Sequence, residues 1–175
     1  MIRPLFLILT VFFSIVSFGQ GKNYWTAAKA DTFTPDALFE RSSTPSKYLL
    51  YSLDFERFKT ALNSVTVSED QLFQSDVILT LPLADGTFED FQFADYAVMH
   101  PDLQKQYPEI RSFKGVSLQD KSKVIYTTVN IFGVHSMLHT AGKPIEYMDT
   151  YTKDLSTYVV YSRNDIENVN SFECH

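Results

Sequence analysis

The stretch that decides the fold is Leu79–Gly115, which reads LTLPLADGTFEDFQFADYAVMHPDLQKQYPEIRSFKG. Its first residues continue an alternation of apolar side chains that begins at Val77, which is the pattern of a half-buried strand. Asp85-Gly86 then supplies the positive φ angles of a tight hairpin turn. Two phenylalanines carry the alternation along the return strand, so the segment predicts a β-hairpin.

A short helical segment is predicted after the hairpin. It starts with His100-Pro101-Asp102-Leu103 and must end near Tyr107-Pro108, because a residue before proline is disfavoured in the α-helical region. A further strand leads towards Gly115. Since His100 stands at the junction into the helical turn, we expect it to cap that turn or to hydrogen-bond locally rather than to catalyse.

An amphipathic helix is predicted over residues 53–62. Ser52 is its expected N-cap, and acidic residues occupy the first turn, where the helix dipole favours them. Phe55, Phe58 and Leu62 are spaced i, i+3 and i+7, so they form one apolar stripe. We therefore expect this helix to lie against a sheet.

More strand-like segments follow Gly115, with turn sequences between them. We expect a fold of the α+β class: a curved, mainly antiparallel sheet of about six or more strands, with one or two short helices packed on it. The further strands are expected at residues 124–129, 134–140, 145–151 and 158–162.

The composition is that of one globular domain. With 45% hydrophobic residues, 15 Phe and 10 Tyr, the chain is not disordered, and a net charge of −6 is unlike that of a nucleic-acid-binding protein. One cysteine excludes an internal disulfide framework. We expect a signal peptide at 1–19, an extended arm at 20–46, the domain itself at 47–163 and a polar tail at 164–175.

The amino terminus is typical of a secretory signal. Arg3 precedes an apolar run, residues 5–16, and Ser17-Phe18-Gly19 places small residues before a cut ahead of Gln20. A membrane anchor would need about 20 apolar residues, and this run is shorter. The expected location is therefore extracellular or periplasmic, without a stable membrane anchor.

Three pieces of the deciding stretch carry a family resemblance: LPLADGTFEDF, AVMHPDLQKQYPEI and RSFKG. Together they resemble the amino-terminal propeptide-like region of secreted reprolysin-like zinc metallopeptidases from Gram-negative bacteria. The resemblance extends more loosely over residues 25–163 and stops before any catalytic motif. It implies a prodomain that assists folding and maintains latency. The implied partner is a zinc metallopeptidase catalytic domain, in cis if the chain is a fragment, and the zinc belongs to that downstream domain.

Two histidines stand at the spacing of a zinc-peptidase helix. His135 and His139 form H-x-x-x-H, but Ser136 occupies the position of the glutamate that serves as general base in H-E-x-x-H. The local pattern is that of a strand, in which residues four apart are separated by about 13 Å, too far for two ligands of one zinc ion. We expect both side chains on one face of a sheet, without a metal.

Cys174 is the candidate metal ligand of this chain. Its thiolate could occupy the position that a catalytic zinc keeps for water, and His175 offers an imidazole beside it. The flanking residues lack the arginine and glycine that surround the cysteine of matrix-metallopeptidase switches. A free thiol, or a cysteine that pairs with one in another domain, is therefore an open alternative.

No catalytic motif is present, so we expect no enzymatic activity and no cofactor in this chain. The chief alternative to a prodomain is a stand-alone extracellular binding module, in which a curved sheet rich in Phe and Tyr holds an apolar ligand or a surface partner. A hydrolase that uses acidic residues is a third, weaker interpretation.

Overall fold

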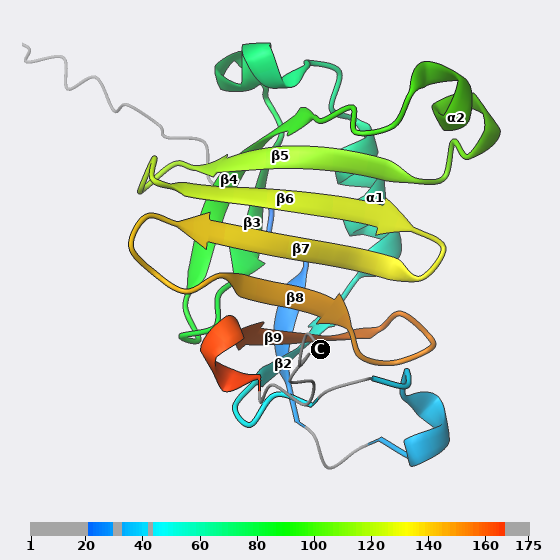
Figure 1. Cartoon of the computed structure of the whole chain (residues 1–175), viewed down its shortest axis with the longest axis vertical. Helices are drawn as coiled ribbons and strands as arrows, with labels where there is room; N and C mark the ends of the chain where they lie inside the picture. The colour runs from blue at the N-terminus through cyan, green and yellow to red at the C-terminus, as the bar shows by residue number, and fades with distance from the viewer. Residues whose placement is uncertain (1–20, 30–32, 42–43, 167–175) are drawn as a thin grey trace, which may run out of the picture.

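The protein, seen here in a computed structural model that describes residues 21–29, 33–41 and 44–166, contains one nine-stranded antiparallel sheet (Figure 1). The predicted α+β class with a mainly antiparallel sheet is confirmed, and the sheet is larger than the prediction stated. The strands are Trp25–Ala28 (β1), Leu49–Leu53 (β2), Ile78–Pro82 (β3), Phe88–Asp95 (β4), Arg111–Ser117 (β5), Lys123–Asn130 (β6), Gly133–Thr140 (β7), Glu146–Thr150 (β8) and Thr157–Ser162 (β9).

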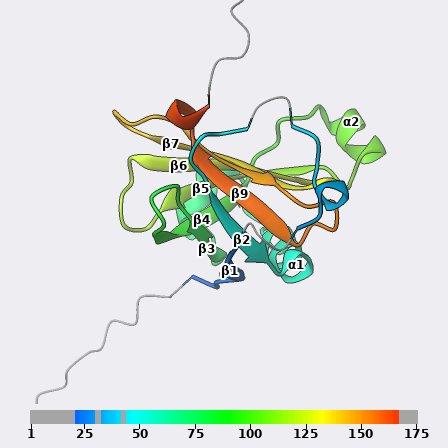
Figure 2. The same cartoon turned by 90° about the horizontal axis from the view of Figure 1, so that it is seen from below.

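The sheet curls until its edge strands nearly meet, in the order β1-β2-β9-β8-β7-β6-β5-β4-β3. Strands β3 to β9 form an up-and-down meander, and β2 and β1 lie beside β9. Lys22 joins the two edges: its N–H donates to the Ile78 carbonyl and its carbonyl accepts from the Thr80 N–H, both at 3.1 Å. Figure 2 shows β1 close to β3 at this seam. The result is a nearly closed, barrel-like sheet.

The predicted hairpin is formed by β3 and β4, but its turn differs from the prediction. Only Gly86 has a positive φ angle, of 90°, whereas Asp85 does not. The Gly86 N–H donates to the Leu83 carbonyl (3.1 Å), and the Leu83 N–H donates to the Thr87 carbonyl (2.9 Å). These bonds define a three-residue loop in which a tight turn is followed by one left-handed residue, and glycine adopts that conformation without a steric penalty.

The predicted amphipathic helix is present as Phe55–Asn63 (α1). Its N-cap is Asp54, whose carboxylate accepts from the Arg57 N–H (3.3 Å), and not Ser52, because β2 continues through Ser52 to Leu53. Phe58 and Leu62 are fully buried, as the stripe predicted, and α1 covers one end of the barrel.

The second helix is Pro101–Gln106 (α2), capped by His100 as predicted. None of its residues is buried, so α1 is the α-helix that packs into the core. Short 3-10 helices lie at Pro35–Ala37 (η2), Glu69–Gln74 (η3) and Arg163–Asp165 (η4). None of the described helices is long and apolar enough to cross a membrane.

Inward-pointing aromatic side chains fill the barrel. Phe91, Phe93 and Phe113 have no exposed surface. Position 115 lies among them and needs glycine, because a Cβ there would come within 2.7 Å of Ile125 Cγ2 and 2.9 Å of a Phe93 ring carbon. In the RSFKG sequence, Phe113 therefore fills the core with its ring, and Gly115 leaves room for the side chains around it.

Two strands lie where no strand was expected. β1 falls inside the segment 20–46 that the sequence suggested was an extended arm, and Trp25 from it is buried in the core. β2 lies in residues for which no strand was predicted, and it includes Ser52, the expected N-cap of the helix. Within the described residues the sheet thus begins at Trp25, ahead of residue 47. The four strands predicted after Gly115 are all present, as β6 to β9.

Candidate functional site

A cleft of about 500 Å³ opens on the outer face of the sheet, the face turned away from α1 in Figure 1. Its floor is formed by β7, β8 and β9, and one wall is formed by residues 39–41. We call it the outer cleft. It is lined by Phe39, Glu40, Arg41, Phe132, His135, Asp149, Thr150 and Tyr161.

The wall belongs to a segment, residues 33–41, that crosses the end of the β8–β9 hairpin. Leu38 forms an antiparallel bridge with Thr152, and the Phe39 N–H donates to the Tyr151 carbonyl (3.1 Å). Main-chain hydrogen bonds therefore fix the segment over β8. Phe39 is held half-buried at the edge of the cleft.

Arg41 brings a positive charge into the outer cleft. Its Nη2 donates to the Thr150 carbonyl at 3.0 Å, which anchors the guanidinium to the end of β8. Its Nε is buried and has no hydrogen-bond partner among the described residues. An unpaired guanidinium N–H is unfavourable in a buried position, because this donor has lost contact with water and has gained no acceptor in exchange.

A hydrogen-bonded network of three side chains lies on the floor of the cleft. His135 on β7 and Asp149 on β8 point outward, and His135 Nδ1 lies 3.0 Å from Asp149 Oδ1. The Tyr161 hydroxyl donates to Asp149 Oδ2 at 2.7 Å. Because a carboxylate accepts hydrogen bonds, it orients the imidazole with the proton on Nδ1. The Nε2 atom of His135 is then left as an acceptor, or as a donor once the ring is protonated.

The electrostatics of the network keep Asp149 ionised. Burial alone would raise the pKa of Asp149, but the hydrogen bonds from His135 and Tyr161, together with the charges of His135 and Arg41, hold this pKa below its usual range. Burial and the neighbouring carboxylate of Asp149 raise the pKa of Tyr161 well above its usual value. At neutral pH the cleft therefore contains a carboxylate, a guanidinium and an un-ionised phenol.

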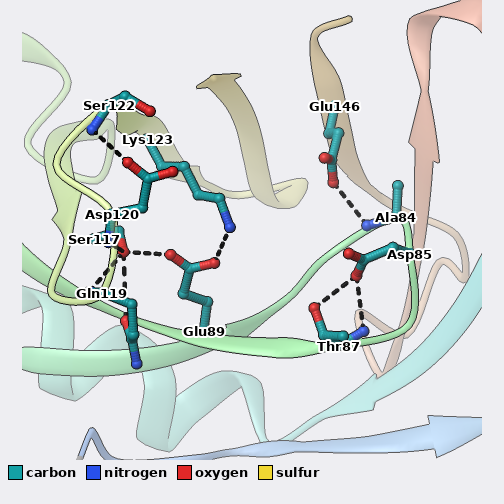
Figure 3. A network of polar contacts seen from close by, with 10 residues as sticks. All are labelled: Ala84, Asp85, Thr87, Glu89, Ser117, Gln119, Asp120, Ser122, Lys123 and Glu146. Atoms are coloured by element: carbon teal, nitrogen blue, oxygen red, sulfur yellow. Dashed lines mark hydrogen bonds and ion pairs between the residues drawn. The ribbon is translucent and has the colours of Figure 1, made fainter. Parts of the chain in front are cut away.

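A second polar network lies at the end of the barrel that carries the β3–β4 and β5–β6 turns, and Figure 3 shows it from close by. Glu89 on β4 points inward, accepts a hydrogen bond from the Ser117 hydroxyl and forms an ion pair with Lys123. The side chains of Glu89 and Lys123 are only 8% and 18% exposed. We call these three residues the mouth network.

Loop residues beside the mouth network are also bonded to one another. Figure 3 shows the Ala84 N–H donating to Glu146 Oε2 at 2.7 Å, which ties the β3–β4 turn to β8. Hydrogen bonds from Thr87 hold the pKa of Asp85 below its usual value. Because these polar groups pair with one another, their evident role is to order the loops.

The space inside this end of the barrel is small. The pocket between the β3–β4 turn and strands β6 to β9 has a volume of about 10 Å³, which is room for about one water molecule. It is lined by Pro82, Leu83, Ile125, Ser136, Leu138, Glu146, Tyr147, Met148 and Val160. Of these two places, only the outer cleft has room for an organic ligand.

The candidate residues from the sequence lie in different places. Cys174 and His175 fall outside the described residues. His135 and His139 both lie on the outer face of β7, as predicted, but they do not act together: His135 joins Asp149, and the His139 ring packs edge-on against Tyr126 at 5.9 Å. Among residues 21–29, 33–41 and 44–166, no three His, Cys, Asp or Glu side chains are arranged to hold a metal.

Sequence reasoning missed Arg41, Asp149 and Tyr161. The available signal was the alternation in β8 and β9, which turns Asp149 and Tyr161 towards solvent while Met148 and Val160 point inward. That signal gives the face of each strand but not the register between strands.

Comparisons with models of protein families, with curated proteins and with solved structures gave no match.

Proposed function

We propose that this chain is a secreted prodomain that assists the folding of a zinc metallopeptidase and keeps it latent, with the outer cleft as its contact site. The resemblance of residues 79–115 to such prodomains supports the class of partner. The outer cleft is the observation that carries the proposal of a contact site, because its network is accessible: the side chains of His135 and Asp149 are 40% and 29% exposed.

The position of the cleft fits a partner linked in cis. Tyr161 lines the cleft, and the chain then passes through η4 to Ile166, where the described residues end. The Ser46 N–H donates to the Asp165 carbonyl at 2.7 Å, which fixes this exit point. A catalytic domain that followed in the same chain would be connected to this point through residues 167–175.

Latency has two candidate mechanisms. In the first, the Cys174 thiolate, with His175 beside it, occupies the open coordination position of the partner's zinc and displaces the nucleophilic water. In the second, part of the chain lies across the substrate cleft as an added strand. The two differ in whether inhibition depends on the thiol.

The test is inhibition in trans. Residues 20–175, added in micromolar excess to a matched zinc domain, are expected to slow peptide cleavage; no slowing would count against the proposal. Arg41→Gln is expected to weaken inhibition, whereas His139→Gln, on the same sheet face but outside the cleft, serves as the matched control. Cys174→Ser separates the two mechanisms, since unchanged inhibition would leave only steric blockage.

Of the barrel mouth and the outer cleft, only the outer cleft has room for the ligand of the alternative, a stand-alone module for an apolar ligand. The pocket at the barrel mouth holds about one water, whereas Phe132 at the outer cleft is 55% exposed. Extraction of the purified protein with organic solvent, followed by mass spectrometry, tests this alternative. A stoichiometric apolar compound would favour it over the prodomain.

A further inference from the structure

We propose that the outer cleft is a carboxylate-binding site that takes the carboxyl-terminal aromatic residue of a polypeptide, with Arg41 as the carboxylate-binding group. This deepens the proposed function, because it states the chemistry of what the contact site recognises. It does not depend on the partner being a peptidase. It rests on which polar atoms of the cleft are paired and which are not.

The carboxylate on the floor of the cleft is already paired. Asp149 Oδ1 is bonded to His135 and Asp149 Oδ2 to Tyr161, so each of its oxygens has a partner. The positive charge of the cleft belongs to Arg41, whose buried Nε–H has no partner among the described residues. A carboxylate matches the planar fork of a guanidinium and would compensate this charge.

Arg41 is positioned before a ligand arrives. Its Nη2 is bonded to the Thr150 carbonyl, and Phe39, two residues earlier, is held by a main-chain hydrogen bond to the Tyr151 carbonyl. The guanidinium therefore needs little further ordering to bind an anion, which favours affinity. Capture of a terminal carboxylate by fixed donors is a known mode of peptide recognition.

The apolar part of the ligand has its own surface. Phe39 and Phe132 line the cleft with the charged groups, and Phe132 is 55% exposed. A volume of about 500 Å³ accommodates an aromatic side chain together with its carboxylate and the preceding peptide group. Aromatic side chains in the ligand can pack against these rings, so the cleft should prefer them to aliphatic ones.

The charges of the cleft act in both directions on a ligand. Asp149 and Glu40 oppose an incoming carboxylate, whereas Arg41 attracts it. An acid should therefore bind more tightly than its amide only where its carboxylate meets the Arg41 guanidinium.

The experiment compares two probes that differ in one charge: N-acetyl-L-phenylalanine and its amide, titrated into the labelled chain from residue 20 onward and followed by NMR. The acid is expected to bind at least about tenfold more tightly than the amide, which is the effect of one charged hydrogen bond. The Arg41 Nε–H resonance should shift with the acid, a readout that needs no variant. Equal affinities, or an unmoved Arg41 resonance, would overturn the proposal.

Variants assign the effect to the cleft. Arg41→Gln should abolish the preference for the acid. Arg163→Gln removes a positive charge from the same face but outside the cleft, and it should keep the preference. A preference that survives Arg41→Gln would contradict the assignment.

Two further arms identify the source of the carboxylate and separate this inference from the prodomain proposal. A tripeptide that ends in phenylalanine should bind at least as tightly as N-acetyl-L-phenylalanine. If the chain binds benzoate but does not bind the tripeptide, the ligand is a small aromatic acid and the proposal of a polypeptide terminus is overturned. The zinc-domain assay can fail while the acid is still preferred, or succeed while acid and amide bind equally. The two failures are therefore distinguishable.

Discussion

The mouth network and the outer cleft each combine an acidic, a basic and a hydroxyl side chain, but they differ in how completely these groups are paired and buried. In the mouth network, Glu89 is paired with Ser117 and Lys123, and little of it meets solvent. In the outer cleft, His135 is 40% exposed and Arg41 keeps a buried N–H without a described partner. A closed network supports the fold, whereas an open one is available to a ligand.

The difference follows from where each network lies on the sheet. The mouth network points into the barrel, where ionic groups are stable only if they pair with each other. The cleft network lies on the outer face, where the exposed parts of His135 and Asp149 are open to solvent. We therefore expect changes in the mouth to alter stability and changes in the cleft to alter binding.

The largest effect is expected in the mouth network. Lys123→Met should lower the free energy of unfolding by about 3 kcal/mol, because it leaves the Glu89 carboxylate buried without its ionic partner. Urea unfolding of residues 20–175 measures this loss. The double variant Glu89→Leu/Lys123→Met should recover most of it, and a single variant as stable as the parent would break the comparison.

A smaller loss is expected on the floor of the cleft. Asp149→Asn should destabilise by about 1–2 kcal/mol, because an amide offers one acceptor oxygen to the two donors, His135 and Tyr161. The same urea experiment applies. Asp102→Asn, a change in a carboxylate that is 75% exposed on α2, is the matched control and should leave the midpoint unchanged.

The two regions should respond to opposite ends of the pH range. The pKa of Asp149 is lowered in the folded state, so its contribution is complete above about pH 4 and is lost as the pH falls through the folded value. The hydrogen bond to Glu89 raises the pKa of Lys123, so its contribution is complete below about pH 10 and is lost as the pH rises through the folded value.

Thermal midpoints measured against pH check this contrast. The difference between the parent and Asp149→Asn should shrink in acid, and the difference between the parent and Lys123→Met should shrink in alkali. Other groups also titrate in both ranges, and subtracting each variant from the parent removes their contribution. Parallel curves at both ends would show that the two networks do not differ in this way.

The smallest effect on stability is expected for Arg41→Gln. The change removes one hydrogen bond, to the Thr150 carbonyl, but also the unpaired Nε, so the free energy of unfolding should change by no more than about 0.5 kcal/mol. Calorimetry measures this difference. A loss comparable to that of Asp149→Asn would mean that Arg41 mainly supports the fold.

Local signals made most of the fold predictable. The β3–β4 hairpin and strands β6 to β9 are joined by short turns, and their alternation is visible within a few residues. β1 was missed because WTAA has one large apolar residue and pairs with β2, which lies far along the chain. β2 was missed because it runs directly into the cap of α1, so strand and helix signals overlap at Ser52–Asp54.

The outer cleft could not be predicted in the same way. His135 and Asp149 are 14 positions apart, and Arg41 meets the Thr150 carbonyl from 109 positions away. These contacts depend on strand register and on the path of residues 33–41 over the hairpin. The H-x-x-x-H spacing suggested His139 as the partner of His135, whereas the structure pairs His135 with Asp149 on the next strand.

Sequence separation divides the sheet into two parts. The meander β3 to β9 consists of neighbouring hairpins, so its contacts close short loops, whereas β2 must find β9 across the whole meander and Lys22 must find Leu79 across α1 and η3. Pairings that distant form slowly, because the chain loses more entropy before they form. The N-terminal strands should therefore join the sheet after the meander, and the single bridge at Lys22 should be the first contact of the sheet to exchange its amide protons.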